Sequence, residues 1–88
     1  MNGSTNGSRR QQVDATVTAV FAEVFGKDAI THDDDFFALG GSSLSAAIIV
    51  SKLENSLGAE IPLRLLMENG RVGSFVDRLA ETLDAPVG

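Results

Sequence analysis

The sequence predicts an all-α fold: a small four-helix bundle of three main helices and one short helix, with a long loop between helices 1 and 2. Three observations support this class. Apolar residues recur at the spacing of one helix face in three segments. No segment alternates apolar and polar residues as a surface strand does, and glycines follow three of the expected helices. With 88 residues, the chain is long enough for one domain.

The first helix is expected over residues 9–25, where apolar residues fall at i, i+4, i+7, i+8 and i+11. They are Val13, Val17, Val20, Phe21 and Val24. Gly26 follows as a C-cap. Residues 1–8 are mostly Gly, Ser, Asn and Thr, and we expect a flexible tail there. The folded domain is therefore expected over residues 9–84, followed by a short C-terminal tail at residues 85–88.

Residues 27–42 are expected to form the long loop. Its four apolar residues indicate that it packs onto the core, since a disordered loop has no use for them. They are Ile30, Phe36, Phe37 and Leu39. The three acids at 33–35 lack the spacing of an EF-hand calcium loop, and there is no second acidic cluster. We expect these acids to cap turns and to remain in water.

The second helix is expected over residues 43–57, between Ser42 as N-cap and Gly58. One apolar stripe consists of Ala46, Ile49, Val50, Leu53 and Leu57. A second, offset stripe consists of Leu44, Ala47 and Ile48. A surface helix needs only one stripe to pack on a core, so the second stripe indicates a surface for a partner.

The remaining helices follow from Pro62 onward. A short helix is expected over residues 63–69, between Pro62 and Gly70. The last helix is expected over residues 72–83, with an apolar face made of Val72, Phe75, Val76, Leu79, Ala80 and Leu83.

The composition excludes several classes of function. The net charge is −5 and the seven basic residues are scattered, apart from the adjacent Arg9 and Arg10, which argues against nucleic acid binding. The absence of cysteine excludes disulfides and thiolate metal sites. No apolar run approaches the ~20 residues of a membrane span, and the N-terminal residues lack the apolar core of a signal peptide. We therefore expect a cytoplasmic protein.

The serine pair at the start of the second helix does not match a hydrolase. The nucleophile elbow G-x-S-x-G fails around Ser42, because position 44 is Leu44, and around Ser43, because position 45 is Ser45. The single histidine, His32, is expected to be a solvated loop residue. Phosphate-binding glycine motifs of the P-loop and dinucleotide types are absent too.

The position of Ser43 suits a phosphate-linked group. A serine in the first helical turn lies beside unpaired backbone N–H groups and the positive end of the helix dipole. Gly40 and Gly41 would let another backbone segment approach closely, since glycine has no Cβ. An ordinary helix start with Ser42 as the cap explains the same residues equally well.

The stretch DDFFALGGSSL, residues 34–44, resembles the carrier-protein signature D-x-F-F-x-L-G-G-x-S-L of nonribosomal peptide synthesis, and every specified position matches. The order of elements over residues 10–84 is similar as well. The resemblance implies that Ser43 carries a covalent 4′-phosphopantetheine arm taken from coenzyme A. Ser42 fills the variable position, and Asp34, Gly40 and Gly41 complete the polar and glycine positions of the motif.

Members of this family present the serine helix and the preceding loop to successive enzymes. The implied partner contacts are Leu44, Ala47, Ile48 and Met67. Burial of Leu44 and Ile48 in the core is the alternative. Phe36 and Leu39 are implied to anchor the loop against the bundle.

The chain departs from the family pattern in two places. Arg71 stands before the last helix where relatives usually have Thr, and Arg lacks the hydroxyl that caps N–H groups, so that helix is expected to fray or to start differently. Met67 replaces a frequent Phe, and its flexibility suits changing partners. The serine helix carries no acid from Leu44 to Leu53, which favours a peptidyl carrier over an acyl carrier.

The resemblance is to discrete, type II peptidyl carriers, with a piece of a larger synthetase as the alternative, and it implies a non-catalytic protein, which we expect to be a monomer. The implied partners are a phosphopantetheinyl transferase, an adenylation enzyme and condensation or tailoring enzymes, with neither nucleic acid nor membrane among them. Three alternatives remain at this point. They are an acyl carrier of a polyketide or fatty-acid pathway, a helical interaction module without the arm, and a small hydrolase.

Overall fold

The computed structural model describes residues 5–84, which form four α-helices. Their bounds are α1 Thr5–Phe25, α2 Ser43–Leu57, α3 Leu63–Glu68 and α4 Val72–Asp84. The order and number of helices are those predicted from the sequence, and the part of the chain that the structure describes holds one isolated β-bridge and no strand. None of these helices is long and apolar enough to cross a membrane.

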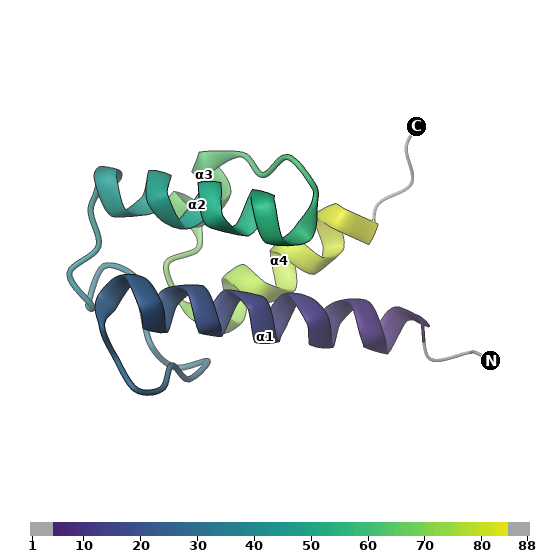
Figure 1. Ribbon diagram of the computed structural model, residues 1–88, viewed down its shortest axis with the longest axis horizontal. Coiled ribbons are helices and arrows are strands. Elements are labelled where there is room, and N and C mark those ends of the chain that lie inside the picture. Colours follow the sequence, from purple (N-terminus) through teal and green to yellow (C-terminus); the bar gives the residue numbers. More distant parts are fainter. Residues whose placement is uncertain (1–4, 85–88) are drawn as a thin grey trace.

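The helices pack around one another in the order α4–α1–α2–α3, and α3 also contacts α4 to close the bundle. Figure 1 shows α1 running alongside α2, with the α1–α2 loop at the end of the bundle where α2 begins. The start of α1 and the end of α4 lie at the other end (Figure 1). Ion pairs from Arg10 to Asp77 and from Arg9 to Asp84 link α1 to α4.

The core is made of apolar side chains alone within the described residues. Its buried members are Val13, Val17, Val20, Phe21, Phe36, Ala46, Ile49, Val50, Leu53, Ile61, Leu66, Val72, Phe75, Val76, Leu79 and Ala80. Most of them belong to the periodic stripes predicted from the sequence. Phe21, Phe36 and Phe75 are fully buried, and the rings of Phe21 and Phe36 meet edge to face with centroids 6.3 Å apart.

The first helix begins four residues earlier than predicted. The composition of residues 1–8 predicts a flexible tail, but α1 starts at Thr5, so residues 5–8 are helical. Asn, Gly, Ser and Thr have low helix propensities, which explains why the sequence alone did not extend the helix. The predicted tails at residues 1–4 and 85–88 lie outside the described residues.

The α1–α2 loop is attached to the start of α4 by backbone hydrogen bonds. The N–H of Phe36 donates to the carbonyl of Gly70 at 2.7 Å. The N–H of Val72 donates to the carbonyl of Asp34 at 2.8 Å, and that of Gly73 to the carbonyl of His32 at 3.0 Å. The loop is therefore part of the packed structure, as expected from its apolar residues.

These bonds also explain how α4 begins without a capping hydroxyl. The expectation that α4 would start differently because of Arg71 is wrong, since α4 starts at Val72 as its periodicity predicted, whereas fraying of its first turn stays a prediction. Two loop carbonyls accept hydrogen bonds from the N–H groups of Val72 and Gly73. They satisfy N–H groups of the first turn, which is the role that a capping Thr hydroxyl would have. The side chain of Arg71 instead reaches Asp33 at 3.1 Å.

Candidate functional site

The start of α2 is closed by Ser42 and Ser45. Ser42 has an extended backbone with φ −140°, and its Oγ accepts a hydrogen bond from the N–H of Ser45 at 3.4 Å. The Oγ of Ser45 accepts from the N–H of Ser42 at 2.7 Å. This reciprocal arrangement is a capping box, and it confirms Ser42 as the N-cap.

Ser43 is the first helical residue of α2, and its side chain is exposed. The capping box uses the side chains of Ser42 and Ser45, and no hydrogen bond within residues 9–84 engages the hydroxyl of Ser43. The N–H groups of Ser43 and Leu44 likewise have no acceptor within the described residues. An exposed hydroxyl beside unpaired N–H groups at a helix N-terminus fits a phosphodiester.

The two glycines before the serines have different structural roles. Gly40 has φ +97°, a backbone conformation that residues other than glycine rarely adopt. Gly41 packs against the ring of Phe36, where a Cβ would stand 2.5 Å from each ring Cε atom. The glycine pair predicts the close approach of a backbone segment, but at Gly41 the ring of Phe36 occupies that space. The lack of a Cβ at Gly41 therefore lets the buried Phe36 ring pack directly against the backbone two residues before Ser43.

The acids of the loop stabilise turns, as predicted. Asp34 accepts a hydrogen bond from the N–H of Thr31 at 2.9 Å, and its backbone carbonyl holds Val72. Asp35 accepts from the N–H groups of Phe37 and Ala38 at 3.0 and 3.1 Å. The described residues contain no group of three or more His, Cys, Asp or Glu that could hold a metal ion.

The loop anchors differ in burial. Phe36 is fully buried, and Leu39 and Ile30 pack against the core as partly buried residues. Phe37 was expected to anchor the loop as well, but it is 48% exposed. Its ring instead lies close over Gly70 and meets Phe36 with centroids 5.1 Å apart. Both residues lie in a turn closed by the bond from the Leu39 N–H to the Asp35 carbonyl, and only Phe36 enters the core there.

The second apolar stripe of α2 faces solvent. Leu44 is 73% exposed and Ile48 41% exposed, and Ala47 is exposed too. Core burial of Leu44 and Ile48 is therefore the wrong alternative. Met67 is only partly exposed because it packs against the core. Leu63 of α3 is 41% exposed, and its exposure was not predictable because α3 is too short to show a periodic stripe.

The single histidine lies away from the serines in the hydrogen-bond network. The Nε2 of His32 is 2.8 Å from a carboxylate oxygen of Asp14 on α1, and its side chain is half exposed. This contact links the loop to α1. His32 therefore belongs to the surface of the loop, as expected, and no contact connects it to Ser43 within the described residues.

The sequence is similar to a known protein family and to parts of larger known proteins. Residues 15–79 match the family described as "Phosphopantetheine attachment site". Surfactin synthase subunit 3 of Bacillus subtilis (strain 168) is 41% identical over 59 residues, which cover 67% of this chain. The chain spans only 5% of the length of that relative.

Two solved structures are similar to this fold. BlmI, described as a type-II acyl-carrier-protein from Streptomyces verticillus involved in bleomycin biosynthesis, has a TM-score of 0.82 and 32% identity. The match covers 93% of this chain and 99% of that one. A nonribosomal PCP domain has a TM-score of 0.67 and 35% identity, covering 75% and 84% of the two chains. The chain therefore belongs to the phosphopantetheine-attachment family of carrier proteins.

Proposed function

We propose that this protein is a peptidyl carrier whose arm is attached to Ser43. The observation that carries the proposal is the exposed, unengaged hydroxyl of Ser43 at the first position of α2, next to a Ser42 that is committed to the cap. Members of the family carry 4′-phosphopantetheine covalently, and the group supplies a terminal thiol that holds an acyl group as a thioester.

In this function the chain itself holds the phosphopantetheine arm and presents the attached acyl group to partner enzymes. The Ser43 oxygen would form the phosphodiester, with the phosphopantetheine of coenzyme A transferred by a separate phosphopantetheinyl transferase. The unpaired N–H groups of Ser43 and Leu44 and the dipole of the 15-residue α2 favour the negative charge of that phosphodiester. The chemistry of loading and transfer belongs to partner enzymes, so we propose a non-catalytic role.

The surface beside Ser43 supports the peptidyl class. The exposed face of α2 presents Leu44, Ala47 and Ile48, and no acid occurs from Leu44 to Leu53. We propose that an adenylation enzyme and condensation or tailoring enzymes dock on this stripe, with Met67 at its border. Such contacts would be mainly apolar. We further propose that the carrier is a cytoplasmic monomer that binds each enzyme transiently.

An acyl carrier is the second candidate, because BlmI, the neighbour with a TM-score of 0.82, is described as an acyl-carrier-protein. The two candidates differ in what is loaded on the arm. The protein bearing its arm is incubated with ATP, magnesium, amino acids and adenylation enzymes, and in parallel with malonyl-coenzyme A and a malonyl transferase. Intact mass reports the group gained. The peptidyl proposal predicts an aminoacyl adduct, whereas a malonyl adduct alone would establish the acyl candidate.

A further inference from the structure

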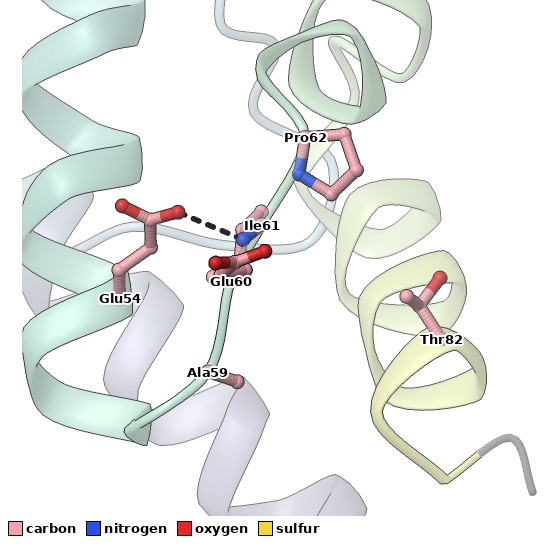
Figure 2. A pocket seen from close by; sticks show the side chains of 6 residues that line it. All are labelled: Glu54, Ala59, Glu60, Ile61, Pro62 and Thr82. Atoms are coloured by element: carbon pink, nitrogen blue, oxygen red, sulfur yellow. Dashed lines mark hydrogen bonds between the residues drawn. The ribbon is translucent and has the colours of Figure 1, made fainter. Parts of the chain in front are cut away.

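Two adjoining hollows form one groove beside the C-terminal half of α2, and we name it the charged groove. The first has a volume of about 560 Å³ and is lined by Glu54, Ala59, Glu60, Ile61, Pro62 and Thr82. The second has a volume of about 310 Å³ and is lined by Pro62, Arg64, Leu65, Glu68, Arg78 and Thr82. Figure 2 shows Glu54 and Glu60 on one side of the first hollow and Thr82 of α4 across from them.

Several charged groups of this groove have no ion-pair partner among the described residues. Six of the seven Lys and Arg residues form an ion pair within the described residues, and the exception is the exposed Arg64. Glu60 is also exposed and takes part in no ion pair or hydrogen bond between described residues. Glu54 accepts the N–H of Ile61 at 2.9 Å with one carboxylate oxygen, and its other oxygen has no such partner (Figure 2).

The groove combines apolar walls with charged side chains along its length. Its first hollow holds the carboxylates of Glu54 and Glu60 without a cation. Its second holds the guanidinium groups of Arg64 and Arg78 with the single carboxylate of Glu68. Arg78 also approaches Glu81 at 3.8 Å, but both side chains are mostly exposed, so this pair is weak. A surface with this pattern fits a partner that offers a basic side chain beside an acidic one.

The charged groove lies within reach of an enzyme that acts at Ser43. Glu54 is eleven residues after Ser43 on α2, which corresponds to about 16 Å along the axis and returns to within about 20° of the same direction. A standard interface buries roughly 800 Å² on each partner, a patch about 30 Å across. One partner can therefore cover Ser43 and the groove together.

We propose that the charged groove is a second contact for the enzyme that loads the arm. That enzyme presents a basic side chain to Glu54 and Glu60 and an acidic side chain to Arg64. This inference rests on the proposed function. Every enzyme that approaches Ser43 meets the same apolar residues Leu44 and Ile48, which discriminate weakly between partners. Charged contacts add both selectivity and association rate, and the groove supplies them.

Charge reversal tests the inference. Glu60→Lys and Arg64→Glu are each made in the full chain, converted to the form bearing the arm, and loaded by the cognate adenylation enzyme at low ionic strength. We expect kcat/KM for loading to fall about tenfold in each variant, through KM, and the loss to shrink at high salt because exposed charges are screened. The phosphopantetheinyl transferase reaction of each variant is measured in parallel and is expected to be unchanged. Asp28→Lys is the matched control, since Asp28 is an exposed acid with no ion pair in residues 9–84.

Three results would overturn the inference alone, and a fourth would refute the proposed function as well. Unchanged loading of both groove variants would overturn the inference, as would an equal loss in Asp28→Lys, because the effect would then follow net charge alone. A parallel loss in the transferase reaction would also overturn it, since the contact would not belong to the loading enzyme. A wild-type protein that no adenylation enzyme loads would instead refute the proposed function and the inference with it.

Discussion

At the scale of single residues, two adjacent serines have separate tasks. Ser42 closes the first turn of α2 through its side chain, whereas Ser43 points its hydroxyl into solvent. The local sequence predicted both positions, because the cap and the first helical residue follow from where the periodic segment begins. The roles of Gly40 and Gly41 were predicted only in part, since the approach of the Phe36 ring is a tertiary contact.

The two serines should differ in their effect on stability. Ser42→Ala removes the acceptor for the N–H of Ser45 and is expected to lower the free energy of unfolding by about 0.5–1 kcal/mol. Ser43→Ala removes an exposed hydroxyl without a partner and should change it by less than about 0.5 kcal/mol. Urea denaturation followed by circular dichroism measures both. A larger loss in Ser43→Ala would show that its hydroxyl supports the fold.

Gly41→Ala should destabilise the protein by about 1–3 kcal/mol, because the added Cβ overlaps the buried ring of Phe36. Urea denaturation of Gly41→Ala, Phe36→Leu and the double variant gives a double-mutant cycle. The smaller Leu side chain relieves the overlap, so the double variant should lose less than the sum of the two single losses. Strict additivity would contradict this account, because the loss in Gly41→Ala would then not come from overlap with the Phe36 ring.

At the scale of elements, α2 divides into a face buried in the core and an exposed face that carries apolar residues. Periodicity predicted both faces, and the buried set Ala46, Ile49, Val50 and Leu53 matches the first predicted stripe. The start of α4 was not predictable in the same way. Its N–H groups are satisfied by carbonyls of Asp34 and His32, which lie about forty residues earlier in the sequence. No local pattern around Arg71 contains that information.

Substitutions on the exposed face of α2 should slow loading of the arm and leave the fold intact. Leu44→Ala and Ile48→Ala are expected to lower kcat/KM for loading about fivefold, because docking residues are lost. Their free energies of unfolding should change by less than about 1 kcal/mol. Leu53→Ala is the contrast, since Leu53 is fully buried and its truncation should cost about 2–5 kcal/mol. Stopped-flow or quench loading assays and urea denaturation separate the two effects, and unchanged loading by both surface variants would remove the stripe from the docking site.

At the scale of the whole molecule, the candidate attachment residue Ser43 lies at one end of the helical bundle. The α1–α2 loop leads into the start of α2 at that end, and hydrogen bonds between distant segments tie the loop to the start of α4 (Figure 1). The motif at residues 34–44 was enough to predict the candidate attachment residue. The charged groove was not predictable, because its lining comes from α2, the following linker, α3 and α4, and only the fold brings these segments together.

The attachment of the arm at Ser43 has the most direct test. The protein is incubated with coenzyme A, magnesium and a broad-specificity phosphopantetheinyl transferase, and its intact mass and free thiols are recorded. The chain has no cysteine, so any thiol must come from the arm. We predict one added phosphopantetheine and one thiol in the wild type and in Ser42→Ala, and neither in Ser43→Ala. An unmodified wild type beside a control carrier that is modified in the same tube, or a Ser43→Ala variant that still gains the arm, would contradict the assignment.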